Sequence, residues 1–119
     1  MRKVLVIEYD EQVLLYVREV LAEQEFEVVT ARSAVEARRL LAAERPDLVI
    51  STFSLPEAER QQIVDAVQGV EETPGVPLLF MATESGPKLI RKWTKAGASG
   101  FLNKPFLPED LLKEVSRLV

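Results

Sequence analysis

Two residue types are missing from this 119-residue chain, which contains no cysteine and no histidine. Without cysteine there is no disulfide, no thiolate zinc site and no cysteine nucleophile. Without histidine, serine–histidine and cysteine–histidine catalysis and the usual imidazole metal sites are excluded as well. These absences remove several common kinds of catalytic and metal-binding site from consideration.

Long apolar runs are missing too. No apolar stretch approaches the roughly 20 residues that a helix needs to span a bilayer. The first ten residues, MRKVLVIEYD, contain a strand-like run that is too short and too soon acidic for a signal peptide. We therefore expect a cytoplasmic protein that does not bind membranes.

Length and charge restrict the number of domains and the kind of partner. The chain is 47% hydrophobic and 29% charged, which is typical of a globular protein. Its length favours a single domain, residues 1–119, either standing alone or cut from a longer protein. The net charge of −4 argues against direct nucleic-acid binding through the whole surface.

Strand and helix patterns alternate along the whole chain. Short apolar runs predict strands at residues 4–7, 28–30, 48–52, 78–82 and 100–103. Helical spacing predicts helices at residues 11–24, 33–45, 57–68, 87–97 and from 108 onward. The second helix begins with a capping box at Ser33 and Glu36, and its apolar stripe includes Val35. The segment TPGV, residues 73–76, predicts a turn. This order predicts an α/β fold, (βα)5 and doubly wound, with helices on both faces of a five-stranded parallel sheet.

Cofactor binding is one function open to such a fold. A flavin or nucleotide would need a loop after the first strand that cradles phosphate. That loop reads EYDEQ, whose carboxylates repel phosphate, and no G-x-x-x-x-G-K-[ST] motif occurs. We therefore expect no cofactor of either kind.

Four segments resemble the response-regulator receiver domain family. RKVLVIEYDE is similar to the family's first strand, RPDLVISTFSLPE to its third, VPLLFMA to its fourth, and AGASGFLNKPF to its fifth strand with the Lys-Pro that follows. The resemblance covers essentially the whole chain. It implies a flavodoxin-like, CheY-like sheet of strand order 2-1-3-4-5 and a role in two-component (phosphorelay) signal transduction.

The resembling family carries its reaction on five kinds of side chain around one pocket. An aspartate accepts the phosphoryl group, and together with two acidic residues it holds Mg²⁺. A hydroxyl and a lysine bind the phosphoryl oxygens. An aromatic residue on the fifth strand changes rotamer with the hydroxyl.

This sequence departs from the family at the acceptor position, which falls on Thr52. Thr52 lies six residues after Pro46, four before Pro56 and 52 before Lys104, as the family spacing requires. Threonine cannot form an acyl phosphate and brings no negative charge to a metal ion. Lys104, the family lysine, is retained.

Two further positions are altered. The acidic pair falls on Glu8 and Tyr9, so that one carboxylate remains and a phenol replaces the other. The hydroxyl position falls on Ala82, and the neighbouring Thr83 should point the other way on a strand. The aromatic position is Phe101, which the family tolerates. Because Mg²⁺ dehydrates reluctantly and negative charges are lost, we expect its binding to be weak or absent.

The retained lysine and the proline after it carry two structural expectations. We expect Lys104 to form an ion pair with Glu8, which remains as a carboxylate partner. We expect Thr52 to be a small, partly buried polar residue rather than a kinase substrate. The resemblance also implies a cis peptide bond between Lys104 and Pro105.

The fourth predicted helix is basic on its outer face in a chain that is acidic overall. We predict a possible interaction face there, made of Lys88, Arg91, Lys92, Trp93 and Lys95. Tryptophan is often an anchor in interfaces, although its place beside the apolar stripe favours partial burial. In the family, the surface of the fourth helix, fifth strand and last helix is the usual output and dimer face.

These departures predict a pseudo-receiver, a non-enzymatic domain that is not phosphorylated and acts through protein–protein contact. Expected partners are an output domain, a histidine kinase or another receiver, including a second copy docked through the fourth helix, fifth strand and last helix. Two alternatives stay open. One is a phosphoacceptor receiver that uses a non-standard site. The other is a module that binds a small anion in the vacated pocket around Glu8, Thr52 and Lys104.

Overall fold

The computed structural model of the chain describes residues 1–69 and 75–119. In this part of the chain five strands alternate with five helices. The strands are β1 (Lys3–Ile7), β2 (Glu27–Ala31), β3 (Leu48–Thr52), β4 (Leu78–Ala82) and β5 (Gly100–Asn103). The helices are α1 (Glu11–Glu23), α2 (Ala34–Glu44), α3 (Glu57–Val67), α4 (Pro87–Ala96) and α5 (Pro108–Leu118). The predicted (βα)5 organisation is confirmed.

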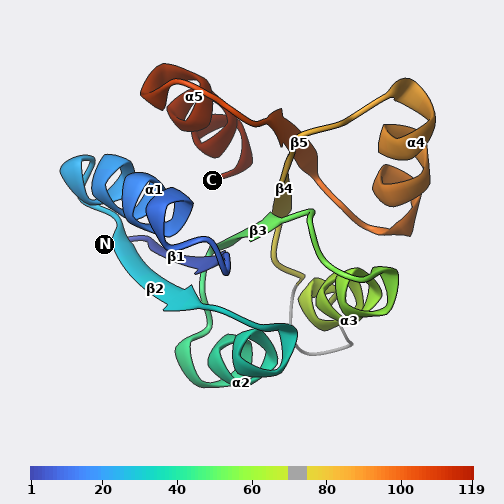
Figure 1. Ribbon diagram of the computed structural model, residues 1–119. Coiled ribbons are helices and arrows are strands. Elements are labelled where there is room, and N and C mark those ends of the chain that lie inside the picture. Colours follow the sequence, from blue (N-terminus) through green and yellow to red (C-terminus); the bar gives the residue numbers. More distant parts are fainter. Residues whose placement is uncertain (70–74) are drawn as a thin grey trace.

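The strands form one parallel sheet in the order β2-β1-β3-β4-β5, which is the predicted order. Helices α1 and α5 cover one face of the sheet, and α2, α3 and α4 cover the other (Figure 1). The register places Ile7 beside Ser51 and Thr52 beside Met81. Because the strands are parallel, their carboxyl ends meet at one edge of the sheet.

Successive side chains of the central strands feed two apolar layers. In β1, Val4 and Val6 pack under α1 and α5, whereas Leu5 and Ile7 pack under α2, α3 and α4. All five residues of β3 and of β4 are buried, which explains the apolar run at residues 48–50 of β3 and along the whole of β4. Each large aliphatic side chain buried in this way contributes about 1.5–3 kcal/mol.

Helix α1 shows how local sequence sets the ends of an element. Asp10 caps it, because its carboxylate accepts from the backbone N–H of Gln12 at 3.0 Å. The helix ends in a Schellman turn, in which Glu25 takes a left-handed φ of 65° and Phe26 N donates to Leu21 O at 3.2 Å.

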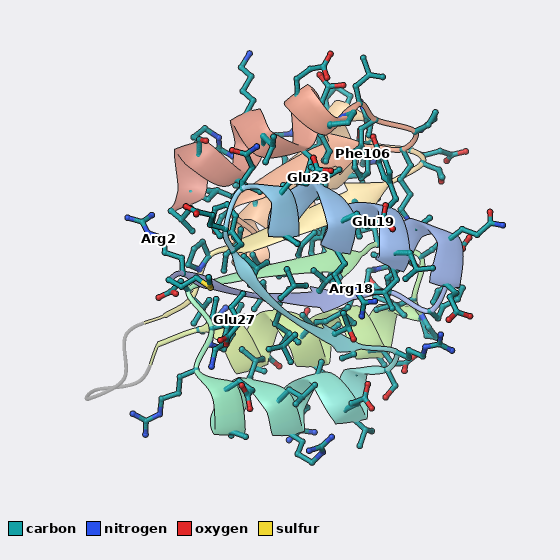
Figure 2. All side chains as sticks on the ribbon, turned by 90° about the vertical axis from the view of Figure 1, so that its left-hand side faces the viewer. Arg2, Arg18, Glu19, Glu23, Glu27 and Phe106 are labelled. Atoms are coloured by element: carbon teal, nitrogen blue, oxygen red, sulfur yellow. The ribbon has the colours of Figure 1, made fainter. Side chains whose placement is uncertain are left out.

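Figure 2 turns the outer side of α1 toward the viewer. Arg18, Glu19 and Glu23 lie exposed on this side, and the buried stripe of the helix faces the sheet. The amphipathic pattern that predicted the helix therefore also gives its orientation.

Several predicted boundaries differ from the observed ones by one residue. Strands β1 and β2 are longer than predicted, because Lys3, Glu27 and Ala31 join the ladder between these two strands. Helices α1, α2, α3 and α4 each end one residue earlier than predicted, and α2 begins one residue later. Thr73 and Pro74 of the predicted turn lie outside the described residues.

The prediction that Val35 lies in the core is wrong. Val35 is 75% exposed, because Ala34 and Ala37 face the sheet in its place. The predicted cap of α2 is confirmed, since Ser33 Oγ accepts from Glu36 N at 3.1 Å. Among the described residues, no helix combines the length and apolarity that crossing a membrane requires.

Candidate functional site

Three of the predicted site residues meet at the carboxyl edge of the sheet. Glu8 follows β1, Thr52 ends β3 and Lys104 follows β5. Lys104 Nζ donates to Glu8 Oε1 at 2.7 Å and to Thr52 Oγ1 at 3.1 Å. The predicted ion pair between Glu8 and Lys104 is therefore present, and it also engages the residue at the acceptor position.

The remaining oxygens of this site are occupied as well. Glu8 Oε2 accepts from the backbone N–H of Asp10 at 3.2 Å, and Thr52 Oγ1 accepts from that of Ser54 at 3.2 Å. Glu8 is 1% exposed and Thr52 is fully buried, whereas the Lys104 side chain keeps 16% of its exposure. The site is a closed polar network, in which a buried charge is compensated by one of opposite sign.

The second acidic position does not contribute to this network. Tyr9 is 54% exposed, so its ring points into solvent. Asp10 is also exposed, and its carboxylate accepts from Gln12 N and Val13 N at the start of α1. The acidity that persists after Glu8 in the sequence therefore caps a helix.

The hydroxyl position is apolar in the structure. Ala82 is 1% exposed, and its carbonyl oxygen accepts from Lys104 N at 2.8 Å. Thr83 is exposed, consistent with the expectation that it points away from the position of Ala82. Phe101 is half-buried at the aromatic position, and the Lys104–Pro105 peptide bond is cis as expected.

The donor set can be tested for the magnesium ion that the resembling family binds. One buried carboxylate, Glu8, faces the pocket, and it is already paired with the Lys104 ammonium. Among the described residues, no group of three or more acidic side chains is placed to hold a metal ion. Mg²⁺ prefers an octahedral shell of oxygens that includes carboxylates. The residues at this pocket do not fit that requirement.

Four cations of the predicted interaction face lie on the surface of α4. Lys88, Arg91, Lys92 and Lys95 are all exposed, and their spacing places them on one side of the helix. Lys92 forms an ion pair with Glu57 of α3. This stripe of four cations is named the cationic stripe below.

Trp93 does not belong to that surface, and its placement there was wrong. Trp93 is 1% exposed, because it lies on the stripe of α4 that faces the sheet. Its ring packs edge-on against Phe53 at 5.7 Å and against Phe80 at 6.0 Å between centroids. The residue is a core anchor of α4.

One residue near the site escaped the sequence analysis. Arg60 of α3 lies with its guanidinium 4.1 Å from the Phe53 ring centroid. The available signal was its position, because residue 60 continues the apolar stripe of Ile63, Val64 and Val67 by one turn. A cation on the inner side of a helix indicates a specific partner there.

Comparisons with known proteins agree with this geometry. A family model described as the response regulator receiver domain matches residues 4–116. The structure of chemotaxis protein CheY4 of Vibrio cholerae superposes with a TM-score of 0.90 and 32% identity, covering 100% of this chain and 99% of that one. The transcriptional regulatory protein PrrA of Mycobacterium tuberculosis is 29% identical over 98% of this chain.

Relatives of very different length share this segment. The hybrid signal transduction histidine kinase D of Dictyostelium discoideum is 29% identical over 98% of this chain, which spans 7% of the kinase. The chain spans 49% of PrrA and 55% of the probable transcriptional regulator ycf29 of Porphyra purpurea. With its CheY-like sheet, its ordered helices and the family match over nearly its whole length, the chain belongs to the response regulator receiver domain family of two-component signalling.

Proposed function

We propose that this receiver domain is a pseudo-receiver, which is not phosphorylated and acts through protein–protein contact. The observation that carries the proposal is the contact of Lys104 with Glu8 at 2.7 Å and with Thr52 at 3.1 Å. A neutral hydroxyl stands where the family needs a carboxylate, and the lysine that would bind a phosphoryl group is held inside the pocket.

The chemistry of the pocket supports this proposal at each step of phosphotransfer. An acyl phosphate needs a carboxylate, and Thr52 offers only a hydroxyl that accepts two hydrogen bonds. Ala82 has no hydroxyl to bind the phosphoryl oxygens. The donor set does not fit Mg²⁺, so no step of the proposed function uses a metal. We infer that the domain is a signalling module and not an enzyme.

The same contacts argue against the two alternatives. A small anion at Lys104 would lie close to the Glu8 carboxylate, which is buried and repels it. A phosphoacceptor at another carboxylate would need an acid in the pocket, and Asp10 is committed to the cap of α1. These alternatives become outcomes of the test below.

The cationic stripe is the contact surface that we propose. Lys88, Arg91 and Lys95 are exposed on α4 and make no ion pair among the described residues. A chain of net charge −4 that gathers these cations on one helix favours a partner with an acidic surface. The proposed partners are an output domain, a histidine kinase or another receiver, including a second copy. The longer relatives support an attached partner domain. The expected cytoplasmic location stays a prediction.

Phosphorylation of the purified domain tests the proposal. The chain is incubated with acetyl phosphate and Mg²⁺, and separately with beryllofluoride and Mg²⁺, and is followed by intact mass and amide NMR. We expect no added phosphoryl group and no shift at Thr52 or Phe101. A stoichiometric mass increase would overturn the proposal. Titration with inorganic phosphate, with shifts read at Lys104, tests the anion alternative in the same sample.

A rebuilt pocket supplies the matched positive control. The variant Tyr9→Asp/Thr52→Asp/Ala82→Thr restores the acidic pair, the acceptor and the hydroxyl around the retained Lys104. We expect it to gain Mg²⁺-dependent phosphorylation under the same conditions, because each family group is then present. If neither chain reacts, unphosphorylated CheY4 incubated with the same donor in parallel shows whether the donor was active.

A further inference from the structure

Helix α3 reaches across to α4 through side chains on one of its sides. The two helices lie on the same face of the sheet (Figure 1). The α3 residues Glu57, Arg60 and Val64, with Gln68 directly after the helix, are spaced three or four positions apart, so they form one line. Each of them lies against a residue of α4 or of its carboxyl end.

Arg60 makes the central contacts of this line. Its guanidinium carbon lies 4.1 Å from the ring centroid of Phe53 and 5.1 Å from that of Trp93. Its Nη1 donates to the carbonyl oxygens of Phe53 at 3.0 Å and Leu55 at 2.7 Å. Phe53 directly follows Thr52. One side chain thus joins α3, the loop after β3 and the buried anchor of α4.

Part of the guanidinium is also shielded from water. Within residues 1–69 and 75–119, Arg60 Nε is the one buried side-chain nitrogen or oxygen without a hydrogen-bond partner. A cation held against aromatic faces is attracted more strongly when it is desolvated. The contact with the two rings is therefore a specific one.

Two further contacts lie at the two ends of the line. At the start of α3, Glu57 forms an ion pair with Lys92 of α4, whose Nζ lies 5.5 Å from the Trp93 ring centroid. At the end of α4, Gln68 Nε2 donates to the Ala96 carbonyl oxygen at 2.8 Å.

Gly97 permits this close approach at the end of α4. It has a φ of 136°, and a Cβ there would lie 2.8 Å from Gln68 Nε2 and 3.2 Å from Val64 Cγ1. A side chain at residue 97 would displace both neighbours. The end of α4 is therefore fitted to α3.

The ring that Arg60 covers also contacts the aromatic position of the family. The centroid of Phe53 lies 6.1 Å from that of Phe101 and 5.2 Å from that of Phe80. Phe80 in turn lies 5.8 Å from Phe101. Arg60 and Phe101 thus act on the same ring from different elements.

We propose that Arg60 clamps Phe53 against Trp93, and that this clamp holds α4 and its cationic stripe in one arrangement. The position of α4 is then set from α3 and not from the pocket at Thr52. The inference rests on the proposed function only in naming the cationic stripe as the contact surface. Its test uses neither a phosphodonor nor a partner, so phosphorylation of the chain would defeat the proposed function and leave the clamp standing.

The test is hydrogen exchange on the whole chain with Arg60→Met, which keeps most of the length and removes the guanidinium. We expect the α4 amides to exchange about tenfold faster or more, because two hydrogen bonds from a charged group and two ring contacts are lost. The amides of α1 should keep their rates. The emission of Trp93, the single tryptophan of the chain, should move to longer wavelength. Arg39→Met, an exposed change on α2, is the matched control and should alter neither readout.

Two results would overturn the clamp. One is α4 exchange in Arg60→Met equal to that in Arg39→Met. The other is an equal acceleration in α1 and α4, because this indicates general destabilisation. If Arg60→Met does not fold, Arg60→Lys and Gln68→Ala are used instead. Arg60→Lys keeps the charge but removes the guanidinium that donates to the Phe53 and Leu55 carbonyl oxygens. Gln68→Ala removes the exposed hydrogen bond to the Ala96 carbonyl oxygen. Both should accelerate α4 selectively, and unchanged rates would contradict the proposal.

Discussion

Replacing Glu8 by glutamine tests the closed network at the carboxyl edge of the sheet. The substitution preserves the shape of the side chain. Its single amide oxygen can take the place of Oε1, which accepts from Lys104 Nζ, or of Oε2, which accepts from Asp10 N, but not of both. It removes one buried negative charge, and Lys104 then remains as a positive charge without its carboxylate. The change therefore removes the charge of Glu8 together with one of the two hydrogen bonds that its carboxylate accepts.

The expected loss follows from the burial of the two side chains. Removing one partner of a buried ion pair costs about 3–5 kcal/mol. Glu8 is 1% exposed, but Lys104 keeps 16% of its side-chain exposure and its hydrogen bond to Thr52. Both facts place the loss at the lower limit, about 3 kcal/mol. For a domain of this length, that lowers the Tm by about 12 °C.

Urea and thermal unfolding of Glu8→Gln, Lys104→Met and the double variant measure this loss of stability. The double variant should lose less than the sum of the single ones, because it leaves no uncompensated charge. Glu11→Gln is the matched control, since Glu11 is 68% exposed in its ion pair with Arg32 and should lose less than about 1 kcal/mol. A loss for Glu8→Gln as small as that of the control would refute the reasoning.

Three further predictions concern elements away from the pocket. Hydrogen bonding to Lys92 holds the pKa of Glu57 below its usual range, so this pair stabilises the fold at neutral pH and stops doing so as the pH falls through the lowered pKa. The Tm difference between wild type and Glu57→Gln should accordingly shrink on acidification, and a constant difference would contradict it. Glu25→Gly should raise the unfolding free energy by about 0.5–1 kcal/mol, because glycine adopts the positive φ at this turn without strain. Ser33→Ala should lower it by about 1 kcal/mol by removing the cap on Glu36 N, and urea unfolding checks both values.

Much of the fold could be predicted because buried strands and amphipathic helices have different patterns of apolar residues. Buried parallel strands have runs of consecutive apolar residues, as at residues 48–50 of β3 and along β4. The buried side of a helix was harder to predict where the helix has both small and larger apolar residues. Val35 was placed in the core for its apolar side chain, but the neighbouring Ala34 and Ala37 fit the closer approach to the sheet. Pattern alone does not encode that distance.

Contacts in the site could be predicted where they join residues at the ends of neighbouring strands. Contacts between side chains of different helices could not be predicted. Glu8, Thr52 and Lys104 lie at the ends of strands whose register is determined by the parallel sheet, so their meeting follows from the sequence order. Arg60 and Trp93 meet because α3 and α4 are adjacent in space. The chain separates them by more than thirty residues, and no local pattern indicates that a cation will lie over a particular ring.

The two apolar layers have a consequence for the order in which the chain is completed during synthesis. The layer under α2, α3 and α4 has Ala98 as the last buried member among the described residues. The layer under α1 and α5 also includes Leu111 and Val115 of α5, which come later in the sequence than Ala98. A nascent chain made from its N-terminus therefore closes one side of the sheet while Val17 of α1 still lacks its α5 cover. We therefore expect α1 to expose an apolar stripe during synthesis until α5 has been added, while α3 and α4 can already pack on the other face.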